Sequence, residues 1–393
     1  MITPRRRKPE AGELPSYASV AGEVRGSSPI EPIAPRLAGT GSIGVPMGKT
    51  SDAARVVIIG TGQMGLVLAD ALVARGLRPV LWGPFPDHVT ELAATRRAEH
   101  RLPGFVLPAE VEVTADESAT GGADLLVNAI PTQFIRSAWG RLRPFMPPNC
   151  PILCTSKGIE NETLLRPTQV IADALGETEG GGGGGGGRAY GALSGPTIAA
   201  ELARRLPATM LAASEDEALT ALGQDLFNVP WLRIYRQTDL IGVELAGATK
   251  NVIALAAGMV DGLGAGDNAK SALLARGLAE IARLGLAMGA QRETFFGVAG
   301  VGDLATTCFS PCGRNRTCGE RLGRGETLDE VLATTVSVVE GVPTTRSVQV
   351  LARSKQVEMP ITEAVAQILF HGLSPTDAIA GLMQRSPKAE RIG

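Results

Sequence analysis

The chain of 393 residues lacks a strong charge of either sign, since its formal net charge is −2. Global electrostatic attraction to nucleic acid is therefore excluded, and any anion site has to be local. No apolar run approaches the ~20 residues that cross a bilayer, so we predict no integral membrane segment. Basic residues 5–8 precede Pro, Gly and Ser instead of an apolar run, which does not indicate a secretory signal.

Cysteine and histidine are also scarce, at five and three residues. An odd number of cysteines in a long chain favours reduced thiols and a cytoplasmic location. Cys308, Cys312 and Cys318 are close in sequence, but their spacing does not suit zinc, and neither a histidine nor a fourth thiol is nearby. We therefore predict free cysteines near a loop and no metal site.

Composition divides the chain into segments. Residues 1–52 are rich in Pro, Gly, Ser and charge and predict a disordered tail, and the glycine tract 180–187 predicts a flexible insertion. Across 53–242 short apolar strands alternate with helices, which predicts a doubly wound, mainly parallel α/β sheet. Small and apolar residues recur at helical spacing across 243–385, so this part is predicted to be an all-α domain, followed by a C-terminal tail at 386–393. The expected strands are 56–59, 79–82, 110–113, 125–130, 152–155, 189–193, 209–212 and 233–235.

The most informative motif places Gly60, Gly62 and Gly65 between the first expected strand and a helix expected over 66–75. In such a strand-turn-helix, the first glycine permits the tight turn and the second lets a pyrophosphate approach the backbone. The third lets the helix pack closely on the strand. The motif favours dinucleotide binding over an ordinary βαβ turn that binds nothing.

The residues that follow the second expected strand do not identify the dinucleotide. An acid at this place binds the ribose 2′-hydroxyl of NAD, and an arginine binds the 2′-phosphate of NADP. This chain has Gly83, Pro84, Phe85 and Pro86 there instead. The sequence thus predicts NAD or NADP as cofactor and leaves the choice open.

Lys250 lies in a segment, 243–259, that is apolar or small on nearly every side, so it is predicted to be buried. None of its helical neighbours is an acid. A buried ammonium with no nearby counter-ion loses proton affinity, which suits an acid or base that works near neutral pH. The alternative is a lysine that extends its amine to solvent from the edge of the helix.

Three other positions carry candidate chemistry. Lys157 follows a strand and can enter the mouth of a crevice, where its charge would polarise a carbonyl, or it is a surface lysine. Asp303 follows two glycines and is either a site residue or a helix N-cap. The basic run 313–316 offers two guanidiniums that suit a phosphate, although a solvated turn is the default interpretation.

Together these segments resemble the NAD(P)-dependent glycerol-3-phosphate dehydrogenase family. The matching stretches occur in the family's order: VVIIGTGQMG, LLVNAIPTQ, CTSKGIE, ALSGPTIAAELA, IGVELAGATKNVIALAAGMVDGLG, GVGDLATTC, GRNR and VVEG. The resemblance covers about residues 55 to 385. It implies a Rossmann-type domain followed by a helical domain similar to that of 6-phosphogluconate dehydrogenase. The implied reaction is reversible hydride transfer between NAD(P)H and dihydroxyacetone phosphate, giving sn-glycerol 3-phosphate for phospholipid synthesis.

The resemblance also implies roles for individual residues. Lys250 would be the general acid and base, Lys157 would polarise the carbonyl and also contact the cofactor, and Asp303 would be a distant partner of Lys250. A phosphorylated small molecule is the implied substrate, and a homodimer is one of the allowed oligomeric states. The other substrate-side residues would be Gly195, Thr197, Asn251, Thr307, Gly313, Arg314 and Asn315. The dinucleotide would be contacted by Gly60, Gly62, Gln63, Met64, Gly65, Ala199, Arg314, Val338 and Glu340.

Two other functions remain open at this point. A β-hydroxyacid dehydrogenase or a ketopantoate reductase would share the glycine turn and a helical lysine, but would not need the phosphate clamp at Arg314 and Asn315. A non-catalytic dinucleotide sensor would use the fold only for binding. The presence of both Lys250 and Asp303 argues against the sensor.

Overall fold

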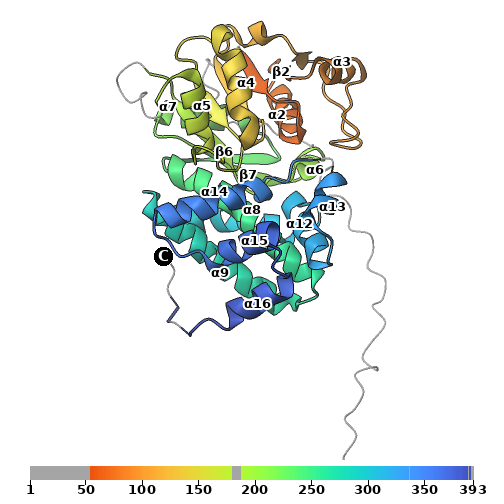
Figure 1. Ribbon diagram of the computed structural model, residues 1–393. Helices are drawn as coiled ribbons and strands as arrows, with labels where there is room; N and C mark the ends of the chain where they lie inside the picture. Colours follow the sequence, from red (N-terminus) through yellow and green to blue (C-terminus); the bar gives the residue numbers. More distant parts are fainter. Residues whose placement is uncertain (1–53, 179–186, 336, 388, 391–393) are drawn as a thin grey trace, which may run out of the picture.

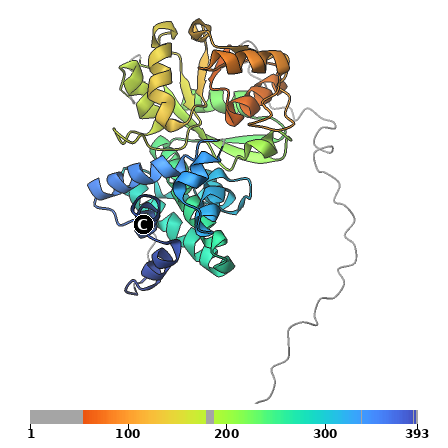
Figure 2. The ribbon, with the colours of Figure 1, turned by 45° about the vertical axis from the view of Figure 1, so that its right-hand side comes forward.

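The computed structural model describes residues 54–178, 187–335, 337–387 and 389–390. The tail predicted for 1–52 lies outside these residues, as do Gly180–Gly186 of the glycine tract and part of the tail 386–393. All strands of the described residues fall before position 240, and only helices follow. Figures 1 and 2 show the strand-bearing part above and the helical part below it. This change from strands to helices agrees with the predicted domain boundary near residue 242, which stays a prediction.

The strand-bearing part contains one eight-stranded sheet in the order β3-β2-β1-β4-β5-β6-β7-β8. Every neighbouring pair is parallel except β6 and β7, which run antiparallel. The α/β class and the mainly parallel sheet are therefore confirmed. The strands are β1 (Val56–Ile59), β2 (Val80–Trp82), β3 (Glu112–Thr114), β4 (Leu125–Asn128), β5 (Ile152–Cys154), β6 (Tyr190–Ser194), β7 (Ala208–Ala213) and β8 (Leu232–Gln237).

Helices cover both faces of this sheet, because all four residues of β1 are buried although their side chains alternate between the two faces. Val56 and Ile58 pack with α2 (Gln63–Ala74) and α7 (Glu217–Phe227). Val57 and Ile59 pack on the opposite face with α4 (Ile135–Leu142) and α5 (Pro167–Leu175). Since both faces are covered, β1, β2 and β5 are continuous apolar runs, whereas the edge strands β3 and β8 also carry exposed polar residues. The remaining helices of this part are α3 (Pro86–Thr95) and α6 (Ala199–Leu202).

All eight expected strands are present, with ends shifted by up to two residues. The helix expected over 66–75 is α2, which begins three residues earlier, at Gln63. Gly65 therefore lies inside the first turn of the helix. A Cβ at this position would be 2.0 Å from the carbonyl oxygen of Gly60, so the close contact predicted for the third glycine is confirmed.

The helical part is organised around α8 (Leu240–Gly262), to which α9 (Gly266–Ala287) packs. Asp239 fixes the start of α8, because its Oδ1 accepts a hydrogen bond of 2.9 Å from the N–H of Gly242. The shorter helices around α8 are α10 (Arg292–Phe296), α11 (Asp303–Phe309), α12 (Arg314–Gly323), α13 (Leu328–Ala333), α14 (Gly341–Ser354), α15 (Pro360–His371) and α16 (Pro375–Met383).

Helix α8 is long and apolar enough to cross a membrane by length and composition, so the prediction that no apolar segment approaches this length was wrong. Its polar residues, among them Glu244 and Lys250, are spaced widely enough to leave the average hydropathy high. The protein itself buries 94% of the most apolar window. Burial of this kind is what the central helix of a folded protein requires.

Glycines allow α12 to lie directly on α8. A Cβ at Gly319 would be 2.0 Å from the carbonyl oxygen of Leu255, and one at Gly258 would be 1.9 Å from that of Arg316. No L side chain fits at such distances, so the two backbones set the spacing of the helices. This contact fixes the position of the first turn of α12, which carries Arg314.

Replacing Gly319 with alanine is therefore expected to destabilise the fold by about 1–3 kcal/mol, the usual cost of overpacking. The matched control is Gly381→Ala in the exposed helix α16, where an added Cβ meets nothing within 4 Å. There the better helix propensity of alanine should stabilise the fold by up to about 1 kcal/mol. Thermal unfolding of both variants measures the difference, and equal melting temperatures would contradict the proposed contact.

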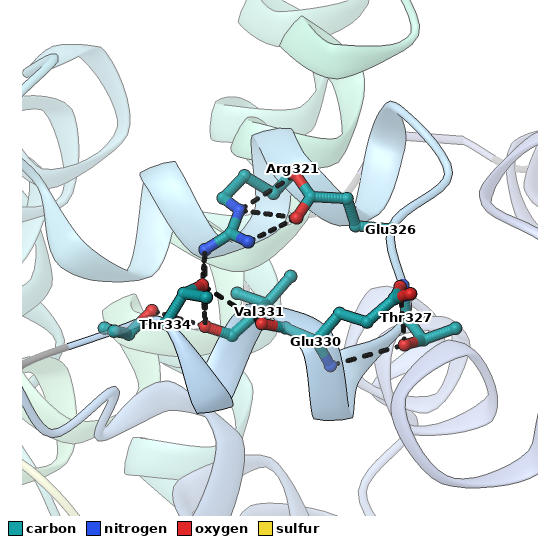
Figure 3. Close-up of polar contacts among 7 residues, drawn as sticks. Arg321, Glu326, Thr327, Glu330, Val331 and Thr334 are labelled. Atoms are coloured by element: carbon teal, nitrogen blue, oxygen red, sulfur yellow. Dashed lines mark hydrogen bonds and ion pairs between the residues drawn. The ribbon is translucent and has the colours of Figure 1, made fainter.

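A polar cluster attaches α13 to the end of α12 (Figure 3). The guanidinium of Arg321 pairs with Glu326 and donates to the Thr334 hydroxyl at 2.8 Å and to the Val331 carbonyl at 3.3 Å. Thr327 and Glu330 form a reciprocal capping box at the start of α13. The cluster thus holds α13 against the end of α12.

Candidate active site

Three charged side chains that are distant in sequence meet where the sheet contacts α8. Lys157 follows β5, Lys250 lies in the middle of α8, and Asp303 is the first residue of α11. The Oδ2 atom of Asp303 accepts from Lys157 Nζ at 2.6 Å, and its Oδ1 accepts from Lys250 Nζ at 2.7 Å. One carboxylate therefore bridges two ammonium groups.

Burial of this cluster changes the pKa of Lys250. The side chains of Lys250 and Asp303 are only 8% and 2% exposed. Burial lowers the pKa of Lys250 to about 8, and the charge of Lys157 lowers it too, whereas Asp303 acts in the opposite direction. The predicted burial of Lys250 and its distant acidic partner are both present. Lys250 can accordingly gain or lose a proton near neutral pH.

The local backbone explains why Asp303 faces the lysines. A single turn of π-helix, η5 (Val298–Gly302), precedes α11, and the N-cap position belongs to Gly302, so Asp303 makes no capping bond. The alternative that Asp303 caps the helix was wrong. Thr307 lies one turn later on α11, and its hydroxyl accepts a hydrogen bond from Lys250.

A chain of amide contacts supports the cluster from behind. Asn251 Nδ2 donates to the Lys157 carbonyl at 3.0 Å, and its Oδ1 accepts from Asn315 Nδ2 at 2.9 Å. The N–H of Gly341 in turn donates to Asn315 Oδ1 at 2.9 Å. These bonds join the loop after β5 to α8, α12 and α14. Asn315 therefore already has protein partners on both ends of its amide.

Arg314 occupies the first position of α12, directly after the N-cap Gly313. The interpretation of residues 313–316 as a solvated turn was wrong, since three of them begin a helix of ten residues. Arg314 is exposed and donates through Nη1 to the Val338 carbonyl at 3.2 Å. Its remaining donors point from a helix N-terminus, where an anion is favoured.

The loop after β6 forms another wall of the site. Lys157 Nζ donates to the Gly195 carbonyl at 3.0 Å, and the Thr197 hydroxyl donates to the same oxygen at 3.1 Å. Ala199 follows as the first residue of α6. Gly195 and Thr197 thus lie beside Lys157, whereas Ala199 is placed farther along the loop.

Val338 and Glu340 lie just before α14. Glu340 Oε1 accepts from the N–H of Thr132, which follows β4, at 3.1 Å. Burial raises the pKa of Glu340, and the positive charge of Arg314 acts against this rise. Glu340 therefore connects the helical part to the carboxyl edge of the sheet.

The cysteines do not form a metal site within the described residues, where no three potential ligands gather. All five are free, and the predicted thiols are therefore unpaired. Burial raises the pKa of Cys308 to about 12 and that of Cys318 to about 11, so both remain protonated. Only Cys312 is exposed.

Comparison with known proteins identifies the family of this chain. Residues 55–220 match the family model of the N-terminus of NAD-dependent glycerol-3-phosphate dehydrogenase, and residues 239–380 match that of its C-terminus. A relative from Salinibacter ruber, named glycerol-3-phosphate dehydrogenase [NAD(P)+] 2, is 45% identical over 85% of this chain and 96% of its own length. The chain belongs to this family.

Two further members of the glycerol-3-phosphate dehydrogenase family are similar to this chain in sequence or in structure. The glycerol-3-phosphate dehydrogenase [NAD(P)+] of Thermobifida fusca is 43% identical over 86% of this chain and 99% of its own. The crystal structure of glycerol-3-phosphate dehydrogenase from Coxiella burnetii superimposes with a TM-score of 0.80 and 32% identity, over 85% of this chain and all of the other. The Rossmann-type sheet followed by a helical domain is therefore the fold of this glycerol-3-phosphate dehydrogenase family member.

The glycine turn of this family member fits a dinucleotide. Gly60 has a positive φ of 126°, and a Cβ there would be 2.7 Å from the Ala129 carbonyl oxygen. Around Gly62 the nearest atom to an added Cβ is 4.0 Å away, so the backbone is open to a ligand. No side chain caps α2, which leaves the N–H groups beside Gln63 and Met64 for an anion.

Sequence analysis missed three buried hydroxyls of this family member. In the part of the chain that the structure describes, the hydroxyls of Thr132, Ser194 and Thr344 are buried and lack a hydrogen-bond partner. Ser194 Oγ and the Lys157 side chain lie on the same side of α8, beside Gly247. Buried polar groups without partners suit a ligand site. Thr132 follows β4 and Ser194 ends β6, so their place at strand ends, where ligands bind in such sheets, was the signal that could have identified these two.

Proposed function

We propose that this protein catalyses reversible hydride transfer between NAD(P)H and dihydroxyacetone phosphate, forming sn-glycerol 3-phosphate. The observation that carries the proposal is the Lys157–Asp303–Lys250 bridge, built into a chain of this family. Two lysines around one buried carboxylate offer both a proton and a positive field to a carbonyl oxygen. The names of the relatives support the same activity.

Lys250 is proposed as the general acid of the reduction. The reduced dinucleotide supplies the hydride to the carbonyl carbon, and negative charge then develops on the carbonyl oxygen. Lys250 Nζ donates its proton to this oxygen, which gives the hydroxyl of the product. In the reverse direction the neutral amine accepts the proton. A pKa of about 8 suits both directions near neutral pH.

Lys157 and Asp303 are proposed to prepare the site for this proton transfer. Lys157 keeps its ammonium close to the same oxygen and polarises the carbonyl. Asp303 holds both lysines in place and maintains part of the proton affinity of Lys250. Asn251 fixes the backbone of Lys157, and Thr307 accepts from Lys250, so these two orient the cluster.

The substrate phosphate is proposed to bind at the N-terminus of α12. Arg314 supplies a guanidinium there, and Gly313, Gly195 and Thr197 line the approach. The amide of Asn315 already bonds to Asn251 and Gly341, so only its remaining hydrogen-bonding capacity is available to the phosphate. We propose that the dinucleotide contacts Gly60, Gly62, Gln63, Met64, Gly65, Lys157, Ala199, Arg314, Val338 and Glu340.

Replacing Arg314 with alanine should raise the KM for dihydroxyacetone phosphate by about 10- to 100-fold, because a charge-assisted contact to the phosphate is lost. The KM for unphosphorylated dihydroxyacetone should change little. The control is Arg324→Ala, which removes an exposed arginine at the C-cap of the same helix, where it pairs with Glu320. Steady-state kinetics measure the KM values for both substrates in the wild type and in the two variants. An unchanged KM for dihydroxyacetone phosphate in Arg314→Ala would contradict the proposed contact between Arg314 and the phosphate.

The cellular setting is also a proposal. We propose a cytoplasmic enzyme that reduces dihydroxyacetone phosphate for glycerophospholipid synthesis, and a homodimer is its proposed assembly. The described residues contain one apolar helix of spanning length, and it is buried in the fold. Sedimentation analysis of the purified chain tests the assembly.

One experiment separates the candidate functions. Oxidation of NADH and NADPH is followed by absorbance with dihydroxyacetone phosphate and, in parallel, with unphosphorylated dihydroxyacetone. Turnover that requires the phosphate supports the proposal. Equal turnover of both substrates would favour a reductase of non-phosphorylated acids or ketones, and cofactor binding without turnover would favour a sensor.

A further inference from the structure

The carboxyl end of β2 is the place where a sheet of this type distinguishes NAD from NADP. Here Gly83 follows the strand, and a Cβ at this position would be 2.7 Å from Thr61 Cγ2 and 2.9 Å from Val89 Cγ2. A side chain at position 83 is therefore excluded. Pro84 carries no ionisable group, and Phe85 is exposed. None of these three residues carries an acid for the ribose or a base for the phosphate.

Arg101 reaches the same turn from the loop before β3. Its Nη1 donates to the Thr61 carbonyl at 3.1 Å, and Thr61 lies between the glycines of the dinucleotide turn. The Gln63 side chain donates to the carbonyl of Arg101, which ties this loop to the start of α2. Thr61 thus holds the half-buried Arg101 side chain beside the turn, and Gln63 holds the backbone of Arg101.

The charge of Arg101 is not neutralised by the protein. Among the described residues Arg101 has no ion pair, whereas Arg97 in the same loop pairs with Glu99 at 3.1 Å. Arg141 also reaches this strand end, where it donates to the Pro84 carbonyl at 3.4 Å, but it pairs with Glu117 and lies over the Trp82 ring. The guanidinium of Arg101 is therefore the cation near this strand end that has no acidic partner.

The positive charge of Arg101 also acts on His88 of α3. Burial lowers the pKa of His88, and the charge of Arg101 lowers it further, while Glu91 acts in the opposite direction. The Nε2 atom of His88 is buried and has no hydrogen-bond partner within the described residues. Asp87 precedes it on the first turn of α3 and is exposed. A polar atom and a cation thus face the region between the turn and α3.

We propose that Arg101 binds the 2′-phosphate of NADPH and makes this chain prefer NADP over NAD. The inference rests on the proposed use of a nicotinamide dinucleotide and goes beyond it by selecting one of the two. The planar guanidinium still has donors that Thr61 does not use, and these match phosphate oxygens. The neutral 2′-hydroxyl of NAD would meet no acid at the end of β2.

The test measures binding without any substrate. Isothermal titration compares adenosine 2′,5′-bisphosphate with adenosine 5′-diphosphate on the full chain, and NADPH with NADH. The wild-type chain should bind each 2′-phosphorylated ligand at least about 10-fold more tightly, as one charge-assisted contact implies. Arg101→Ala should lose about 10- to 100-fold for these ligands and little for the others, and Arg101→Lys should recover part of the loss.

The control is Arg97→Ala, which removes the paired arginine of the same loop and should change neither affinity. Equal affinity of the wild-type chain for both ligands, or a preference for NADH, would overturn the inference and direct attention to Asp87 as the ribose acid. An equal loss for both ligands in Arg101→Ala would also overturn it, because Arg101 would then only brace the turn. Absence of turnover with tight binding of NADPH would instead contradict the proposed function.

Discussion

Replacing Lys250 with methionine is expected to lower kcat for the reduction of dihydroxyacetone phosphate by about 10²- to 10⁴-fold, the range for loss of a general acid. Methionine keeps much of the volume of the side chain within α8 but cannot donate a proton. The affinity for the dinucleotide should change little, because Lys250 faces Asp303 and Thr307 and not the glycine turn. Stopped-flow absorbance and cofactor titration measure the two quantities.

The pH dependence gives this prediction a sign. The pKa of Lys250 is lowered to about 8, mainly by burial. Reduction needs the ammonium, so its kcat should fall as pH rises through about 8, whereas oxidation needs the amine and should rise over the same range. The Lys250→Met variant should lose this ionisation from both profiles. A descending limb that persists unchanged in the variant would assign it to another group.

Lys270 provides the matched control for removal of a buried lysine. Its side chain is 7% exposed and pairs with Asp261 at 2.8 Å, outside the site. The Lys270→Met variant should therefore lose stability but retain kcat. If both lysine variants lost activity alike, the effect of Lys250→Met would reflect packing and not proton transfer.

Replacing Asp303 with asparagine is expected to have the second large effect. The amide has nearly the same shape but leaves two ammonium groups, at 2.6 and 2.7 Å from the former carboxylate oxygens, without a counter-ion. Loss of one partner from a buried ion pair costs about 3–5 kcal/mol. Lys250 should release its proton more easily, so the falling limb of the reduction should move below pH 8, and kcat at neutral pH should drop by about 10- to 10³-fold.

Stability should respond to pH in a defined direction. Between the further lowered pKa of Lys250 in Asp303→Asn and about pH 8, only the folded variant has released this proton. The unfolded chain then binds more protons than the folded variant, so the free energy of unfolding of the variant rises with pH. In the wild type, Lys250 stays protonated in the folded chain over this pH range, so its ionisation does not raise the free energy of unfolding there. The difference in free energy of unfolding between wild type and variant should therefore become smaller as pH rises. Denaturation at several pH values measures it.

Asp261→Asn is the control for this experiment. Asp261 also lies between two cations, Lys270 at 2.8 Å and Arg316 at 2.7 Å, but away from the site. Its amide variant should lose stability and keep both kcat and the position of the pH limb. A pH limb that stayed in place in Asp303→Asn would show that Asp303 does not set the proton affinity of Lys250.

Local patterns were sufficient for most of the fold. The apolar runs at 56–59 and 125–128 become adjacent buried strands, because continuous apolar residues between turns can only be covered on both faces. The glycine turn has the backbone that its spacing requires, with Gly65 against Gly60. The ends of elements were less accurate, as at α2, since the first turn of a helix has few local determinants.

Contacts between distant residues could not be read in this way. The sequence showed that Lys250 is buried without an acid nearby, but Asp303 lies 53 residues away and reaches it only because α11 packs on α8. The π-helical turn before α11 leaves the N-cap position to Gly302, and Arg314 begins α12, which packs on α8. These contacts with α8 depend on how helices cross, and glycines such as Gly319 act there through space that no local pattern records.

The sequence by itself thus determined an α/β sheet with a dinucleotide turn, a helical second part and the buried lysine that we propose as the general acid, because periodicity and glycine spacing are local properties. The tertiary structure decided which charges meet. It placed one carboxylate between Lys157 and Lys250, and it brought Arg101 to Thr61 in the turn after β1. Electrostatic partners act across a few ångströms of space, whatever their separation along the chain.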